Sequence, residues 1–121
     1  MDSSTNNELH ICLGDMWISK HGNEGVIIIG PGYEHSEWLV QPFDGKGWKS
    51  SLALSQEKLE NFYNFNETGS LPAWHLKKDK TVYFNSALKM MVTEDRRLVR
   101  IDPKTGALIP RPSPLENISL Y

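Results

Sequence analysis

The chain has 121 residues, 39% of them hydrophobic and 10% aromatic, which is enough for one small core. Thirteen basic side chains against fifteen acidic ones give a formal net charge of −2, and the pI of about 6.1 excludes the overall basic character of a dedicated nucleic-acid-binding protein. A mean hydropathy of −0.45, with no apolar run near the roughly 18 residues of a spanning helix, predicts a soluble protein without a membrane segment.

Residues 1–12 are predicted to form a flexible N-terminal tail. The opening MDSSTNNE has neither the basic nor the apolar region of a secretory signal, and the single cysteine, Cys12, cannot form an internal disulfide. Both features favour a reducing, cytoplasmic location. His10 and Cys12 would share one face of an extended strand, but a small buried cysteine beside a surface histidine is favoured over a nucleophile pair.

The stretch 13–65 is predicted to be a small β-barrel of five strands. In its first strand, Met16 and Ile18 point to one side and Trp17 to the other, because side chains alternate along a strand. The β-branched run 26–29 suits a strand that is buried on both faces, as in a small barrel.

The next two strands of this stretch are bounded by turn residues. The third strand, 37–41, is predicted to end at Pro42, since proline cannot donate to a ladder. The DGKG sequence at 44–47 is a hairpin signal that leads into a fourth strand, 48–54.

A short helical turn is predicted after the fourth strand, capped by the hydroxyl of Ser55. Leu59, Phe62 and Tyr63 have the spacing of the inner face of such a helix. A single turn followed by a fifth short strand, 62–65, fits the same residues equally well.

The order of these features resembles the small five-stranded barrels of the Tudor-like and KOW-like kind. It runs GDxW, a turn, a β-branched strand, a Trp-bearing strand, a Gly-rich hairpin and LSxxxLxxF, and it covers only the first half of the chain. Such modules are common in small proteins of phages and mobile elements. The resemblance implies a barrel that binds protein segments or nucleic acid and carries no chemistry of its own.

Aromatic side chains are the candidates for contact with a partner. A Tudor-type cage needs several aromatics on one rim, and the order of those in this chain does not reproduce one. Most are expected to serve the core. The residues predicted to contact a protein partner are Trp17, Tyr33, Trp38 and Trp48. Those expected to be largely buried are Ile27, Ile29, Trp38 and Val40.

Residues 66–121 are predicted to be an extension that packs on the barrel, after a polar break at 66–70. The composition of 81–84 predicts a strand. The stretch 86–92 fits either one or two helical turns or an alternating strand, and the helix is slightly preferred.

A hairpin is predicted at 98–109, because an Asp-Pro-x-x-Gly turn at 102–106 separates two apolar runs. The proline-rich residues 110–114 predict an extended tail in polyproline form.

The two halves of the chain differ in charge. Residues 1–70 hold four basic and ten acidic side chains, whereas residues 71–121 hold nine basic and five acidic ones. This asymmetry supports an alternative function, nucleic-acid binding through the second half. The residues predicted for it are Trp74, Lys77, Lys78, Lys80, Arg96, Arg97 and Arg100.

No catalytic or metal-binding pattern is recognisable in the sequence. The four histidines lack zinc-site spacing, and no GxGxxG or Walker sequence is present. Five acidic residues of the barrel loops are predicted to make a solvated rim: Asp15, Glu24, Glu34, Glu37 and Asp44. The favoured interpretation is a non-enzymatic module without cofactor or metal that docks on a protein partner, as a phage or mobile-element protein acting on host machinery would.

Overall fold

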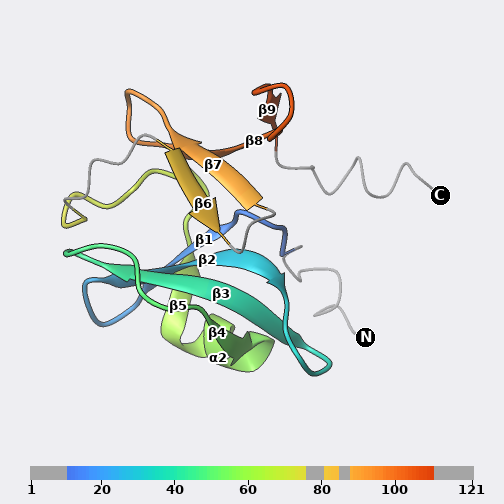
Figure 1. Ribbon diagram of the computed structural model, residues 1–121. Coiled ribbons are helices and arrows are strands. Elements are labelled where there is room, and N and C mark those ends of the chain that lie inside the picture. The colour runs from blue at the N-terminus through green and yellow to red at the C-terminus, as the bar shows by residue number, and fades with distance from the viewer. Residues whose placement is uncertain (1–10, 76–80, 85–87, 111–121) are drawn as a thin grey trace, which may run out of the picture.

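The computed structural model describes residues 11–75, 81–84 and 88–110, and the protein is mainly β (Figure 1). The first antiparallel sheet has the order β4-β3-β2-β1-β5. Its strands are β1 (Met16–Ser19), β2 (Glu24–Pro31), β3 (Glu37–Asp44), β4 (Leu52–Ser55) and β5 (Tyr63–Phe65). The second antiparallel sheet has the order β6-β7-β8-β9. Its strands are β6 (Thr81–Phe84), β7 (Leu88–Val92), β8 (Leu98–Ile101) and β9 (Leu108–Ile109).

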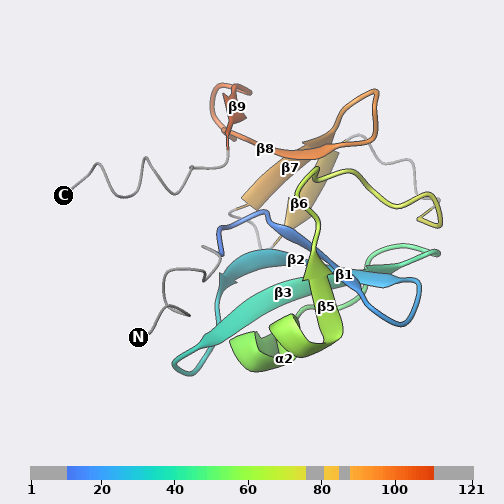
Figure 2. The same ribbon diagram turned by 180° about the vertical axis from the view of Figure 1, so that it is seen from behind.

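Three layers result from this arrangement, as Figure 1 shows: the second sheet above, the first sheet in the middle and helix α2 (Gln56–Phe62) below. Viewed from behind, β5 leads from α2 along β1 toward the second sheet (Figure 2). The first sheet is therefore covered on both faces.

The β-branched run of β2 supplies both faces of the first sheet, as its sequence predicts. Ile27 and Ile29 face the second sheet, whereas Val26 and Ile28 face α2, because neighbouring side chains alternate. Facing the second sheet is the between-sheet core, made of Met16, Ile27, Ile29, Phe43, Leu71, Leu88, Met90 and Leu98. On the other face is the helix-side core, made of Trp17, Val26, Ile28, Val40 and Leu59.

The first sheet has five strands, as the sequence predicts, but these strands do not close into a barrel among the described residues. Strands β4 and β5 are the two edges of the first sheet, and no ladder joins them in the part of the chain that the structure describes. Helix α2 runs directly from one edge to the other. Its cap is Ser55, whose hydroxyl accepts a hydrogen bond from the backbone N–H of Lys58 at 3.2 Å, and Leu59 is fully buried. The helix thus covers the core that barrel closure would have enclosed.

Three details of the first sheet differ from the predicted boundaries. Strand β3 continues through Pro42, whose carbonyl accepts from Lys49 N at 2.8 Å. The N–H and C=O of one residue in an antiparallel strand point to the same side, so the missing donor faces away from β2 and costs no bond to it. Trp48 makes a single bridge to Phe43, residues 49–51 lie outside the strands, and β4 begins only at Leu52.

The predicted inner face of α2 is also wrong in part. Phe62 is 54% exposed, because the helix ends there and the chain turns into β5. Tyr63 is half-buried, and Tyr63–Phe65 forms the fifth strand that the sequence allowed as an alternative.

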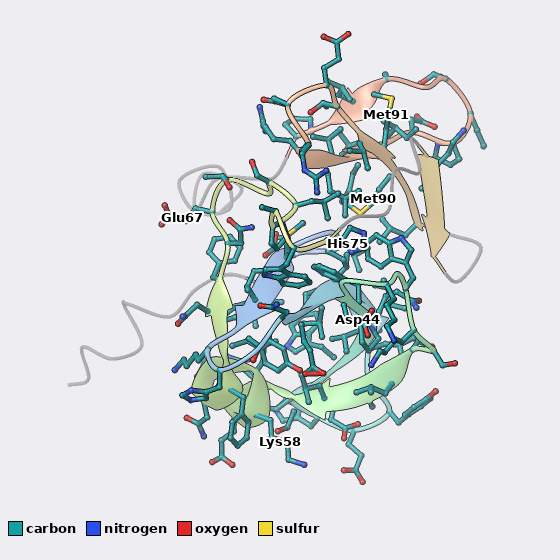
Figure 3. The ribbon with its side chains drawn as sticks, turned by 90° about the vertical axis from the view of Figure 1, so that its left-hand side faces the viewer. Asp44, Lys58, Glu67, His75, Met90 and Met91 are labelled. Carbon is teal, nitrogen blue, oxygen red and sulfur yellow. The ribbon has the colours of Figure 1, made fainter. Side chains whose placement is uncertain are left out.

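The slightly preferred helix over 86–92 is wrong for the residues that the structure describes. Leu88–Val92 is strand β7, paired with β6 on one side and β8 on the other. Figure 3 shows Met90 between the sheets and Met91 on the outer side, as strand alternation requires. Two ladders outweigh a weak helical preference here.

The predicted hairpin is confirmed between β8 and β9. Asp102 Oδ1 accepts from Lys104 N at 2.8 Å, and Gly106 N donates to the Asp102 carbonyl at 2.8 Å. Gly106 has a φ of +77°, which glycine adopts without strain. The predicted tail beyond Pro110 lies outside the described residues.

Asp44 holds the turn after β3 together and also binds His75, which lies in the segment between the two sheets. Its Oδ1 accepts from the backbone N–H groups of Lys46 at 2.8 Å and Gly47 at 3.2 Å, and its Oδ2 lies 3.2 Å from Lys49 Nζ. Its carbonyl accepts from Nδ1 of the buried His75 at 2.7 Å. The backbone N–H of Lys46, followed by the Lys49 ammonium, holds the pKa of Asp44 below its usual 3.8.

We expect Asp44→Asn to make the stability of the protein fall less steeply as the pH is lowered below about 4. A carboxyl group whose folded pKa lies below its unfolded pKa stabilises the fold above the unfolded value, near 3.8, and loses that contribution as the pH falls through the folded pKa. The variant lacks this contribution. Melting temperatures measured between pH 5 and pH 2 test the prediction, and equal acid slopes in the two proteins would contradict it.

Candidate functional site

A cleft of about 290 Å³ lies between the two sheets, at the side where β8 and β9 overhang the start of β1. In Figures 1 and 2 the segment before β1 runs beneath β8 and β9. Residues 13–15 and 65–69 form the lower wall, and Arg97, Val99, Arg100 and residues 108–110 form the upper wall. The buried Met16, Met90 and Leu98 form the floor between the two walls. Both halves of the chain therefore contribute to the cleft.

The segment before β1 is shaped by a tight turn. Asp15 N donates to the Cys12 carbonyl at 3.1 Å, and Asp15 Oδ2 accepts from Cys12 N at 2.9 Å. Gly14 has a φ of +89°, and a Cβ on it would lie 2.8 Å from Cγ and 2.9 Å from Cδ of Arg100. Glycine is thus required for both the turn and the close approach of the Arg100 side chain.

The loop after β5 is held to β8 by backbone hydrogen bonds. Leu98 N donates to the Gly69 carbonyl at 2.8 Å, and Ser70 forms an isolated bridge with Arg97. Asn66 Nδ2 donates to the Ser70 carbonyl at 2.8 Å within the same loop. These bonds fix the width of the cleft at this end.

The surface of the cleft is mostly apolar. Met16, Met90 and Leu98 are buried at its floor. Leu13 and Leu108 stand on opposite walls and are 38% and 59% exposed, so they offer apolar surface to a ligand.

Charged side chains of both signs line the cleft. Arg100 runs across Gly14, and its Nε is buried with no hydrogen-bond acceptor in the described part of the chain. Neither Arg97 nor Arg100 forms a salt bridge with any carboxylate in the described part of the chain. Asp15 is buried and Glu67 is exposed, so two acidic and two basic residues cancel in formal charge. Figure 3 shows Glu67 pointing outward at the side of the molecule.

The four aromatics predicted to contact a partner do not come together. Trp17 is 3% exposed in the helix-side core, so its ring is not available to a partner. Trp38 is half-buried against the same core, and Trp48 packs on Phe43 with ring centroids 5.0 Å apart. Tyr33 is 83% exposed in the loop between β2 and β3. The expected burial of Ile27, Ile29 and Val40 is confirmed, whereas Trp38 is only half-buried.

Part of the predicted nucleic-acid surface is engaged inside the protein. Trp74 stacks on Phe43 with centroids 5.7 Å apart. Arg96 Nη2 donates to the carbonyls of His75 at 2.6 Å and Pro72 at 3.1 Å. Arg97 and Arg100 line the cleft. Three predicted residues lie outside the described part of the chain: Lys77, Lys78 and Lys80.

The predicted acidic rim does not form as one surface. Glu24 stands opposite Asp44 at one end of the β2–β3 ladder, whereas Glu37 lies at the other end and accepts from the backbone N–H of Glu34. Asp15 is buried beside the cleft. No group of three or more potential metal ligands occurs among residues 11–75, 81–84 and 88–110. The nucleophile pair of His10 and Cys12 is the disfavoured interpretation; His10 lies outside the described residues, and Cys12 is half-buried.

One sequence signal pointed toward the cleft. Leu98 and Arg100 are two positions apart in β8, so their side chains lie on the same face of the strand. Leu98 is buried in the core, and a charged residue on the same face is therefore a signal of a site. The opposite wall has no comparable signal, because Leu13 and Leu108 are 95 positions apart in the chain and only the fold brings them to one cleft.

Comparisons with known proteins give no assignment. No protein-family model, no curated protein and no solved structure matches the chain. The resemblance to Tudor-like and KOW-like modules accordingly stays a prediction. Among the described residues, no helix has the length and apolar character needed to span a membrane.

Proposed function

We propose that this protein is a non-enzymatic binding module that docks on a protein partner through the cleft between its two sheets. The observation that carries the proposal is the combination of an apolar floor, two exposed leucines on opposite walls and two arginines without a salt-bridge partner among the described residues. Apolar surface that includes methionine, beside arginine, is typical of the core of protein interfaces.

A protein ligand fits this cleft better than a nucleic acid. The formal charges of its lining residues cancel, whereas phosphate backbones are bound by surfaces with a surplus of Lys and Arg. Trp74 and Arg96, which could have stacked on bases and contacted phosphates, are committed to contacts within the protein.

A charge placed in the cleft is expected to weaken partner binding by about tenfold or more. The change is Leu108→Glu, which sets a carboxylate against the apolar floor. Phe62→Glu is the matched control, because Phe62 is similarly exposed, at 54% against 59%, but lies at the end of α2, on the far side of the first sheet from the second sheet. Both positions are surface sites, where substitutions change stability by about 0.5 kcal/mol or less.

The measurement combines photo-crosslinking with affinity. A photo-crosslinking amino acid is placed at position 108 or 62 of the full chain in its native cell, the crosslinked peptides are identified, and the partner found at 108 is purified and titrated with each glutamate variant. Loss of that partner with Phe62→Glu or Tyr33→Ala, but not with Leu108→Glu, would move docking to another surface. Nucleic-acid binding that weakens steeply with salt and requires Arg97 would favour the alternative function.

A further inference from the structure

Resting on the proposed docking function, we infer that the cleft binds the C-terminal residue of a partner chain. Its α-carboxylate pairs with Arg100, with Arg97 contributing at the rim, and its apolar side chain lies on the floor formed by Met16, Met90 and Leu98.

The orientation of Arg100 is the first observation behind this assignment. Its aliphatic stem is confined by Gly14 and lies beside Met90, because a Cβ on Gly14 would meet both side chains within 3.2 Å. Its Nε is buried and has no acceptor among the described residues, so no hydrogen bond at this atom fixes the guanidinium within the protein. The terminal nitrogens of the guanidinium are not among the buried unpaired atoms, and they form no salt bridge with a carboxylate of the described residues. A carboxylate of a ligand in the cleft would match their planar donor geometry.

The charge balance favours a carboxylate over a phosphate. A phosphate group carries about −1.5 to −2 charges at neutral pH, whereas a carboxylate carries a single one. Asp15 and Glu67 line the same cleft as the two arginines, so each extra negative charge on the ligand meets repulsion as well as attraction.

The size and layout of the cleft favour a terminal residue. At about 290 Å³ it is slightly smaller than most ligand pockets, which measure roughly 300 to 1,000 Å³. The charged group and the apolar floor adjoin each other, because the Arg100 stem lies beside Met90 at the floor. A ligand must therefore present a carboxylate and an apolar group from neighbouring atoms. In a C-terminal residue both branch from the same Cα.

The test uses the four methionines of the full chain, labelled with ¹³C at their methyl groups. Met16 and Met90 line the cleft, whereas Met91 points to the outer face of the second sheet and serves as an internal control. The probes are pentapeptides of Gly and Ser that end in Leu, Phe, Ser or Lys, each as the free acid and as the C-terminal amide. Two further probes are 4-methylpentanoate and inorganic phosphate.

We expect saturable shifts of the Met16 and Met90 methyl signals with the free acids ending in Leu or Phe. The amides, and the peptides ending in Ser or Lys, should bind at least about tenfold more weakly, because a charge-assisted hydrogen bond or apolar contact is lost. Arg100→Gln should remove the preference for acid over amide, and Lys58→Gln, which removes a positive charge on the opposite side of the molecule, should leave it intact.

Three results of the titrations would overturn the inference, and all three are measured on the unmodified protein, so none requires a variant to fold. Equal binding of acids and amides by the unmodified protein would reject carboxylate recognition. Equal or tighter binding of 4-methylpentanoate would reject a peptide terminus, and tighter binding of phosphate would identify a phosphate site. If any of these results accompanies loss of the partner in Leu108→Glu, docking through the cleft stands and only the ligand class is wrong. If Leu108→Glu retains the partner, the proposed function itself fails.

Discussion

Phe43→Ala is expected to lower the free energy of unfolding by about 3 to 5 kcal/mol, as truncation of a buried phenylalanine does. Phe43 is 1% exposed, and its ring centroid lies 5.0 Å from that of Trp48, 5.7 Å from that of Trp74 and 5.1 Å from that of His75. Alanine would leave a cavity and remove three aromatic contacts, each worth roughly 0.5 to 1.5 kcal/mol beyond burial.

The contact with Gly25 makes this cavity difficult to close. A Cβ on Gly25 would lie 2.4 Å from Cζ of Phe43, so the ring packs directly on the backbone of β2. The two strands are paired here, with Gly25 opposite Phe43, and cannot approach further without breaking the ladder.

Denaturant unfolding followed by tryptophan fluorescence measures the effect, with Phe62→Ala as the matched control. Phe62 is the same residue type but 54% exposed, so its truncation should cost less than about 1 kcal/mol. Similar losses in the two variants would show that Phe43 does not hold the between-sheet core in place.

Ile27→Ala is expected to lower the free energy of unfolding by about 2 to 5 kcal/mol. Ile27 is fully buried at the centre of β2 and belongs to the core that the two sheets share. The buried side chains of the second sheet pack against Ile27 and its neighbours in this core, so truncation of Ile27 removes packing from the inner face of the second sheet. Amide exchange in β7 and β8 should therefore accelerate.

Ile28→Ala is the control for this second effect. Ile28 is equally buried but faces α2 in the helix-side core. Its truncation should cost a similar free energy and accelerate exchange first in α2 rather than in β7 and β8. Stability near that of the unmodified protein after Ile27→Ala, or identical exchange patterns in the two variants, would contradict the layered arrangement.

The cleft depends on the same packing as the between-sheet core. Met16, Met90 and Leu98 belong both to its floor and to that core, while Leu13 and Leu108 stand above them on opposite walls. A substitution that loosens the two sheets should consequently weaken binding as well as stability. For this reason the docking test uses the exposed positions Leu108 and Phe62, where the two effects are separable.

Features set by neighbouring residues were predictable from the sequence. The alternation in β1 and β2, the Ser55 cap and the turn at Asp102 all depend on side chains within a few positions of one another. Local sterics and local hydrogen bonds decide such features, so the residue order is sufficient to predict them.

Features that depend on distant partners were not predictable. The sequence of residues 88–92 is compatible with a helix or a strand, and only the pairing with β6 and β8 in the folded protein decides for the strand. Arg96 and Arg97 are adjacent in the sequence, yet Arg96 donates to two carbonyls more than 20 positions away while Arg97 reaches the cleft.

The sequence by itself determined where most strands lie and which side chains face inward, because strand periodicity and turn chemistry act over a few residues. The tertiary structure alone decided that the first sheet stays open, that helix α2 covers it and that both halves share a core with a cleft at its edge. These features bring together segments that are far apart in the chain, as when Leu13 and Leu108, 95 positions apart, line one cleft, and no local pattern encodes which segments meet.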